Sequence, residues 1–180
     1  MESKVNSQFN SVSYRFGSVI VDPGDVQEWT GVEHVLLTHT HFDHIYGLNT
    51  LWAENPQIKV YTNQIGYNAL LNPKLNLSKY HGEPYIFNHP DNIFIVNDKE
   101  IVEIGNGLTA QANFTPGHND SCITWVVDNL LFSGDAFIPG IKVVTNLPGS
   151  DKDKAIESID RILELAKGRR ICPGHRIVKT

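Results

Sequence analysis

Hydrophobic and polar positions along this chain follow two repeating spacings. Alternating or short continuous apolar runs are typical of strands, and apolar residues three and four apart are typical of amphipathic helices. By the first criterion we expect strands at residues 11–21, 35–37, 58–61, 85–87, 93–96, 101–104, 108–114, 123–127, 130–132, 141–144 and 170–172. Strands interspersed with helices favour an α/β fold in which two β-sheets lie between helical layers.

The helical spacing occurs in three segments, at residues 45–52, 64–71 and 151–167. We expect Ser150 to cap the last of these helices, with Asp153 three residues on, and Gly168 to end it. Asp43 precedes the first helix, where its carboxylate could cap the helix or bind a metal ion.

Composition places the chain among ordinary globular proteins. Its 180 residues, 41% hydrophobic and 19% charged, predict a single domain over residues 1–180. No apolar run is long enough to span a bilayer and residues 1–10 are polar, so we expect a cytoplasmic protein. The net charge of −5 makes nucleic acid an unfavourable partner. Cys122 and Cys172 are expected to be free thiols.

Side chains that can bind metal ions fall in four short blocks. They are HTHFDH at residues 39–44, TPGH at 115–118, SGD at 133–135 and CPGH at 172–175. Imidazole and carboxylate groups suit zinc, manganese or iron at neutral pH. Seven such groups are too many for one tetrahedral ion, and they predict two divalent ions that share a carboxylate. The seven predicted ligands are His39, His41, Asp43, His44, His118, Asp135 and His175.

The spacing of the ligands divides them between two ions. His39 and His41 lie two residues apart, so both side chains point to the same side of an extended segment, and His118 could complete a three-ligand site with an open position for water. The second ion is expected to be held by Asp43, His44 and His175, with Asp135 bridging both ions. Zinc is the expected metal, with iron or manganese as alternatives. The other histidines are expected to be ordinary surface or hydrogen-bonded side chains: His34, His81 and His89.

With these blocks the chain resembles the metallo-β-lactamase superfamily and, within it, the glyoxalase II-like hydrolases (hydroxyacylglutathione hydrolases). Residues 39–44 meet the HxHxDH motif of the family, and its later His, Asp and His are met by His118, Asp135 and His175. The turn Asp22-Pro23-Gly24 is similar to the first motif of the family, which implies that Asp22 supports the metal ligands from behind. The resemblance implies an αββα sandwich of two mixed β-sheets flanked by helices.

Three features depart from glyoxalase II. The chain ends five residues after His175, without the C-terminal helical domain that helps to hold glutathione, and this puts a glutathione thioester in question as substrate. Residues 26–33 are too few for the helix that commonly follows the first motif. Tyr46 stands where the family often has a small residue, so it is a candidate for shaping the substrate pocket, with core packing as the alternative.

The resemblance implies a metal-dependent hydrolase with a small-molecule substrate. A hydroxide that bridges two ions would attack a thioester or similar activated acyl group, and Asp43 would act as a catalytic ligand that orients the water. A lactonase is an alternative, although Ala136-Phe137 stands where lactonases often have a tyrosine. Other ester or phosphodiester hydrolases of this fold, and a non-catalytic metal-binding scaffold, are further alternatives.

Overall fold

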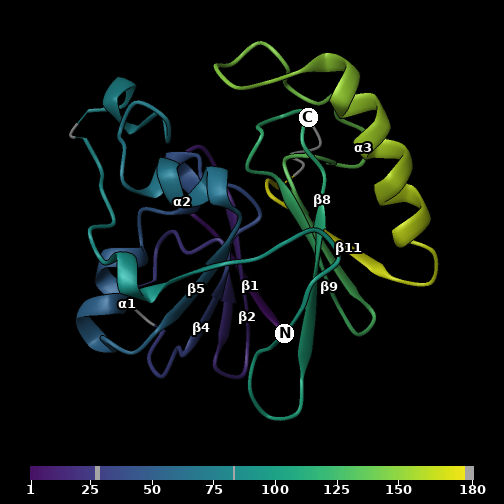
Figure 1. The fold of residues 1–180 in the computed structure, drawn as a ribbon. Helices are drawn as coiled ribbons and strands as arrows, with labels where there is room; N and C mark the ends of the chain where they lie inside the picture. The colour runs from purple at the N-terminus through teal and green to yellow at the C-terminus, as the bar shows by residue number, and fades with distance from the viewer. Residues whose placement is uncertain (27–28, 83, 177–180) are drawn as a thin grey trace.

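The computed structural model describes residues 1–26, 29–82 and 84–176, which form two β-sheets with helices outside them. The first sheet has the strand order β1-β2-β3-β4-β5-β6 and the second the order β11-β10-β9-β8-β7. Figure 1 shows α1 and α2 beside the first sheet and α3 beside the second, with the two sheets between them. The α/β sandwich that the sequence predicts is therefore confirmed.

The first sheet is built by the N-terminal half of the chain. Its strands are β1 (Glu2–Val5), β2 (Val12–Phe16), β3 (Val19–Val21), β4 (His34–Leu36), β5 (Lys59–Thr62) and β6 (Ile93–Ile95). The strands β1 to β3 pair antiparallel and β3 to β6 pair parallel, so the sheet is mixed. The β structure expected at 11–21 is a hairpin of β2 and β3, because Gly17 has a φ of 57° and lets the chain turn between them.

The second sheet is built by the C-terminal half. Its strands are β7 (Ile101–Glu103), β8 (Thr109–Phe114), β9 (Ile123–Val127), β10 (Leu130–Gly134) and β11 (Arg170–Pro173). The strands β10 and β11 pair parallel, and the other neighbours pair antiparallel. A right-handed helical crossover is the usual way to join parallel strands, and α3 stands between β10 and β11 in the chain.

The helices are α1 (Leu48–Glu54), α2 (Gln64–Leu70) and α3 (Lys152–Leu165), with short 3₁₀ turns at Phe42–His44, Ser78–Tyr80 and Pro90–Asn92. Successive residues of β4 face opposite layers, because Val35 packs with Leu48 and Leu51 of α1 whereas Leu36 packs between the sheets with Trp125. The continuous apolar run of this strand thus reflects burial on both faces. Within the described residues, no helix is both long and apolar enough to cross a membrane.

Two predicted strands are wrong. Residues 85–87 are irregular chain, although Phe87 is fully buried and its N–H donates to the carbonyl of Leu70. Residues 141–144 form only an isolated bridge between Ile138 and Ile141. An alternating pattern of apolar residues predicts which side chains are buried. It does not predict whether the backbone has a neighbouring strand with which it can form hydrogen bonds.

The predicted caps are also corrected. The N-cap of α3 is Asp151, whose Oδ1 accepts hydrogen bonds from the N–H groups of Asp153 (2.9 Å) and Lys154 (3.1 Å), whereas Ser150 donates to the carbonyl of Leu147. The first helix begins only at Leu48, so Asp43 lies in the preceding 3₁₀ turn and does not cap it. Cys122 and Cys172 are both buried, free thiols, as expected.

Candidate metal centre

The four metal-capable blocks meet at the carboxyl ends of four strands. The HTHFDH block follows β4, and His118, Asp135 and His175 follow β8, β10 and β11. Two hydrogen bonds join the sheets immediately before the first block. Trp125 donates from Nε1 to the carbonyl of Leu37 (2.8 Å), and the N–H of Ile123 donates to the carbonyl of Thr38 (2.7 Å). Residues far apart in sequence are therefore fixed at one place between the sheets.

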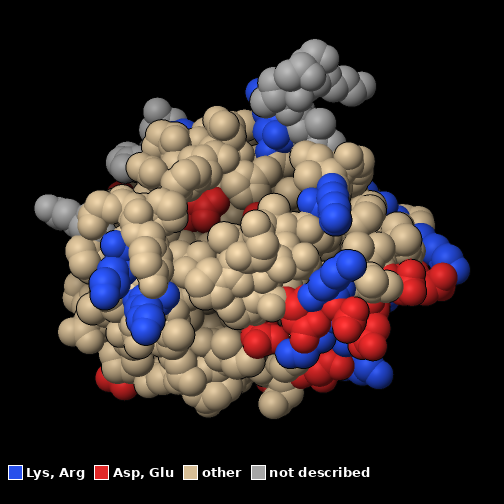
Figure 2. Space-filling model, turned by 90° about the horizontal axis from the view of Figure 1, so that it is seen from above, with Lys and Arg blue, Asp and Glu red and all other residues tan. Residues whose placement is uncertain are grey.

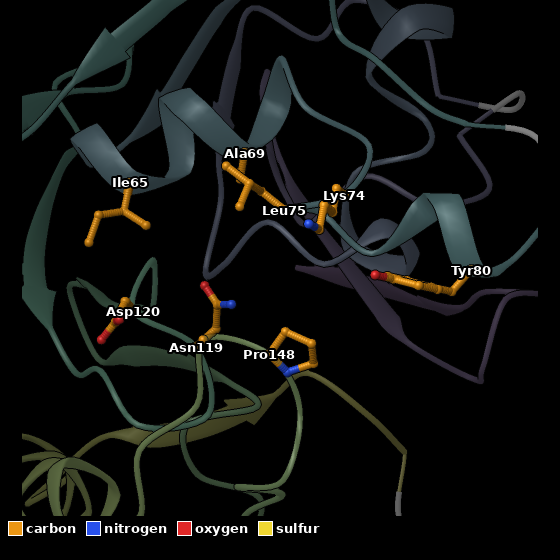
Figure 3. A pocket seen from close by; sticks show the side chains of 9 residues that line it. Ile65, Ala69, Lys74, Leu75, Tyr80, Asn119, Asp120 and Pro148 are labelled. Atoms are coloured by element: carbon orange, nitrogen blue, oxygen red, sulfur yellow. The ribbon is translucent and has the colours of Figure 1, made fainter.

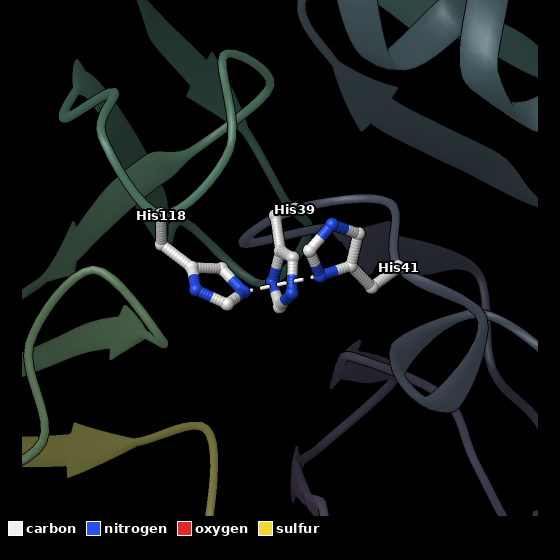
Figure 4. A group of neighbouring side chains, drawn as sticks. All are labelled: His39, His41 and His118. Carbon is white, nitrogen blue, oxygen red and sulfur yellow. Dashed lines mark hydrogen bonds between the residues drawn. The ribbon is translucent and has the colours of Figure 1, made fainter. Parts of the chain in front are cut away.

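The first group of ligand atoms comes from His39, His41 and His118, which are all buried (Figure 4). Nδ1 of His41 lies 3.0 Å from Nε2 of His118, and one nitrogen from each ring lies within 4.8 Å of the others. Three imidazoles converging on one point are the protein ligands of many catalytic zinc sites.

The second group comes from Asp43, His44 and His175. Oδ2 of Asp43 lies 3.3 Å from Nε2 of His44 and 3.3 Å from Nε2 of His175, and these two nitrogens are themselves 3.3 Å apart. The second group therefore offers a mixed nitrogen and oxygen ligand set, which suits zinc, iron or manganese.

Asp135 lies between the two groups. Its Oδ2 is 3.2 Å from Nε2 of His175 and 3.6 Å from Nε2 of His118, and its Oδ1 is 3.6 Å from Nε2 of His44. One carboxylate thus reaches nitrogens of both groups. The structure brings together all seven residues that the sequence singles out.

Two buried atoms in this cluster have no hydrogen-bond partner among the described residues, namely Nε2 of His39 and Oδ1 of Asp135. A buried polar atom left without a partner costs about 1–3 kcal/mol. Both atoms carry lone pairs that face the cluster, and a cation bound there would satisfy them. The donor set and these two atoms therefore fit divalent metal ions.

Hydrogen bonds on the outer side of four of the rings fix which nitrogen faces the cluster. The Nδ1 contacts are His39 with Oγ1 of Thr38 (3.3 Å), His118 with the carbonyl of Val144 (3.0 Å), His44 with Oδ2 of Asp22 (3.1 Å) and His175 with the carbonyl of Phe9 (3.0 Å). When Nδ1–H donates outward, Nε2 keeps its lone pair for a metal ion.

Asp22 lies behind His44 and is itself tightly held. Its Oδ1 accepts from the N–H of Thr38 (2.7 Å) and its Oδ2 from the hydroxyl of Thr38 (2.5 Å) and from His44. Asp22 has a φ of 51°, a conformation that non-glycine residues rarely adopt. A strained backbone conformation of this kind persists only where several contacts hold the residue in place. Here the hydrogen bonds of Asp22 to Thr38 hold it, and its hydrogen bond to His44 orients that ring.

His41 has the opposite orientation, with Nδ1 toward the cluster and Nε2 near Asn119. Nδ2 of Asn119 lies 3.2 Å from that Nε2, and Oδ1 of Asn119 accepts from the N–H (2.8 Å) and hydroxyl (2.7 Å) of Ser121. Sequence reasoning missed Asn119 and Ser121, although their place directly after His118 in the TPGH block could have drawn attention to them.

The electrostatics of the two groups differ. Burial lowers the pKa of His41 to about 3, with His118 adding to the effect, and burial also lowers the pKa of His39 and of His118. Burial opposes the charge of His175 as well, but hydrogen bonds to Asp135 and Asp43 outweigh it and raise the pKa to about 9. The first group is therefore neutral and the second holds protons beside carboxylates.

A cavity of about 340 Å³ opens beside the cluster. Besides His41, Asp43, His118, Asp135 and His175, it is lined by Phe9, Phe42, Leu77, His81, Val144 and Leu147. His81, expected to be an ordinary histidine, lies in this lining and packs edge-on against Phe9. Tyr46 is not among the lining residues; its hydroxyl donates to Oδ1 of Asp25 (2.7 Å).

The other two histidines lie away from the cavity lining. The ring of His34 is stacked with Tyr61, and that of His89 is stacked on Trp52 with ring centres 3.5 Å apart. Cys172 packs in the core between the sheets.

Comparison with known proteins defines the class to which this fold and site belong. The family model described as the metallo-beta-lactamase superfamily matches residues 17–175, and the chain belongs to that superfamily. Among curated proteins, the probable metallo-hydrolase YqgX of Bacillus subtilis (strain 168) is 32% identical over 144 residues, which are 78% of this chain and 67% of the relative. A hydroxyacylglutathione hydrolase of Shewanella pealeana is 28% identical over 183 residues, 94% of this chain.

This chain spans only 59% of the length of the Shewanella pealeana enzyme. Among solved structures, the BLEG-1 B3 metallo-beta-lactamase matches with a TM-score of 0.85 and 27% identity, covering 98% of this chain and 91% of the other. A protein solved in a di-iron-bound form matches with a TM-score of 0.81 and 23% identity over 98% and 93% of the two chains, which shows a shared fold. Family and site together place the chain in the metallo-hydrolase superfamily, with a His/Asp cluster that fits metal ions.

Proposed function

We propose that this protein is a two-metal hydrolase that cleaves an activated acyl compound, with a thioester as the first choice. In this proposal His39, His41 and His118 hold one ion. Asp43, His44 and His175 hold the other, and Asp135 is shared. Zinc as the physiological metal and a cytoplasmic location stay predictions from the sequence.

The position of Asp135 is the observation that carries the proposal. A structural single-metal site needs no carboxylate that reaches the nitrogens of two separate ligand groups. Asp135 approaches His118 on one side and both His44 and His175 on the other, at 3.2–3.6 Å. Its Oδ1 accepts no hydrogen bond from the described residues, and such a buried lone pair is one that a second cation would satisfy.

The chain's own residues would then bind and orient the reactants. Bound divalent ions would supply Lewis acidity, which lowers the pKa of water and stabilises negative charge on a carbonyl oxygen. Asp43 lines the cavity, so its carboxylate can accept a hydrogen bond from the attacking water. Phe9, Phe42 and Leu77 give the cavity apolar walls, and a substrate bound against them would displace water and strengthen the electrostatic interactions at the site.

The thioester assignment rests on similarity to the hydroxyacylglutathione hydrolases, at 27–29% identity. Because this chain spans only 43–59% of their length, the proposal names the reacting group and leaves the identity of the thiol to experiment.

The test is turnover by protein loaded separately with zinc, iron or manganese. Four substrate types are offered: an acyl thioester, a lactone, a β-lactam and a phosphodiester. The β-lactam is included because a B3 metallo-beta-lactamase shares the fold at 27% identity. We expect the thioester to be hydrolysed with the highest kcat/KM. A higher kcat/KM for another substrate would assign the protein to the enzymes that hydrolyse that substrate. Protein that binds two metal ions and hydrolyses none of the four would be a non-catalytic metal-binding scaffold.

A further inference from the structure

A second cavity, of about 290 Å³, adjoins the one at the metal centre. It is lined by Ile65, Ala69, Lys74, Leu75, Tyr80, Asn119, Asp120, Pro148 and Gly149 (Figure 3). Ile65 and Ala69 come from α2, and the loop after α2 supplies the next three residues. The loop after β8 and the loop before α3 supply the others, so one wall belongs to each half of the molecule.

The two cavities are lined by neighbouring residues of the same loops. Tyr80, Asn119 and Pro148 of the second cavity are the sequence neighbours of His81, His118 and Leu147 of the first. Nδ2 of Asn119 in the second cavity lies 3.2 Å from Nε2 of His41 in the first, so two side chains in contact separate the cavities at this point. The two cavities together are called the groove below, and their linings extend from the metal ligands to Ile65 and Ala69 of α2.

The walls of this groove expose large apolar side chains. Exposed fractions are 47% for Ile65, 49% for Leu75 and 60% for Tyr80 in the second cavity, and 54% for Phe9 and 46% for Val144 in the first. Single exposed apolar residues are ordinary, but a contiguous group of them marks a binding surface. Figure 2 shows few charged side chains in the middle of the face seen from above; basic side chains gather on its left, the side of α1 and α2, and acidic and basic side chains gather together on its right, the side of α3.

Two polar groups of the second cavity, those of Asn119 and Asp120, are engaged elsewhere, whereas Nζ of Lys74 and the hydroxyl of Tyr80 remain in its lining. Oδ1 of Asp120 forms an ion pair with Nζ of Lys154 (2.8 Å). The side-chain amide of Asn119 is bound to Ser121 and lies against His41. The apolar side chains of Ile65, Leu75 and Pro148 offer no partners to the many polar groups of a peptide-like thiol such as glutathione, whereas a hydrocarbon chain gains free energy when it is buried against them. The groove is therefore complementary to an aliphatic chain.

We propose that the second cavity is an acyl-chain subsite, and that the substrate is a thioester of an unbranched aliphatic acid whose carbonyl lies at the metal centre and whose chain lies against Ile65, Leu75 and Pro148. This inference rests on the proposed function, because it extends the same site. The atoms exchanged are those of thioester hydrolysis: the C–S bond breaks, a C–O bond forms with water, and the thiol leaves with a proton.

The test is a series of thioesters of one thiol, with acyl chains from acetyl to decanoyl. Each methylene buried in the groove is expected to raise kcat/KM by about fourfold until the groove is full, because burial of a CH₂ contributes about 0.8 kcal/mol. Leu75→Ser and Ile65→Ser should each reduce this dependence on chain length. Ile156→Ser removes a side chain of similar exposure from α3, and it should leave the series unchanged.

A flat series, or a loss in Leu75→Ser that is equal for every chain length, would overturn the subsite. If no thioester is hydrolysed, the proposed reaction fails, and the subsite is tested separately by calorimetric titration with octanoate. Binding that weakens in Leu75→Ser, but not in Ile156→Ser, would support the subsite on its own. An absence of octanoate binding would overturn it, as would a dimer that Leu75→Ser dissociates, since the groove would then hold a second copy of the chain.

Discussion

The side-chain amide of Asn119 faces the ring of His41, with Nδ2 3.2 Å from Nε2. Because Oδ1 of Asn119 accepts two hydrogen bonds from Ser121, the amide can present only its NH₂ group to His41, and Nε2 of that ring must accept. The proton of the neutral ring is then on Nδ1, the nitrogen that points to His118. If a metal ion binds Nδ1 of His41, the proton must move to Nε2. There it would face the NH₂ group of Asn119, so two donors would point at each other.

Replacing the amide by a carboxylate should remove this conflict. In Asn119→Asp an acceptor faces Nε2–H of His41 while the contact with Ser121 is kept, so we expect the first metal ion to bind about tenfold more tightly. Competition with a chromophoric chelator measures the affinity. Asn68→Asp is the matched control, because it makes the same change at an exposed position of α2. Weaker binding in Asn119→Asp would show that the amide assists the metal site.

The two metal sites should respond differently to pH. His175, with a pKa of about 9, holds a proton at neutral pH that a metal ion must displace, and the pKa of His44 is raised as well because Asp43 and Asp135 outweigh its burial. The apparent affinity for the second ion should therefore rise at least about tenfold per pH unit between pH 7 and 8, and the contribution of His175 to this rise should level off above about pH 9.

The first ion should bind with nearly constant affinity over the same range, because burial lowers the pKa of His39, His41 and His118 and these rings are already neutral. Calorimetric titrations in several buffers would measure both affinities and the protons released. Equal pH slopes for both ions would contradict the assignment of charge to the second group.

Gly174 allows the main chain to pass close to the metal centre. A Cβ at this position would overlap Oδ1 of Asp135 and lie 3.0 Å from Cε1 of His44. Gly174→Ala should displace Asp135 and weaken binding of the second ion by tenfold or more. The control is Gly168→Ala, whose Cβ meets nothing within 4 Å but whose φ is 74°. It should lower the free energy of unfolding by about 1 kcal/mol without changing metal affinity. Unchanged metal binding in Gly174→Ala would place Asp135 outside the site.

Much of the fold follows from local pattern. The apolar stripe of α3 and the run at Val35-Leu36-Leu37 predict their elements because a helix or strand that is covered on known faces leaves a regular spacing. The exposed edge strand β1 was not predicted, because Glu2–Val5 leaves only one partly covered side chain and no apolar pattern. Caps depend on which of two adjacent polar residues takes the extended conformation, as at Ser150 and Asp151, and spacing alone does not decide this.

The ligand types at the centre are readable from sequence because metal ions accept few kinds of side chain, and those lie in short blocks. The supporting contacts are not readable in the same way. Phe9 and Val144 accept hydrogen bonds through backbone carbonyls, which any residue carries, so nothing in the sequence marks them. His81 has no motif around it, and only the fold of the loop after α2 brings it to the cavity.

The central claim is that one carboxylate, Asp135, joins two metal sites. The most direct test is the metal-to-protein ratio, measured by mass spectrometry of the metal content after loading and dialysis, for the wild-type protein and for Asp135→Ala. Circular dichroism would confirm that the variant is folded. We predict two ions per chain for the wild type and at most one for the variant. A single ion in the wild type, or two ions retained in Asp135→Ala, would contradict the shared site.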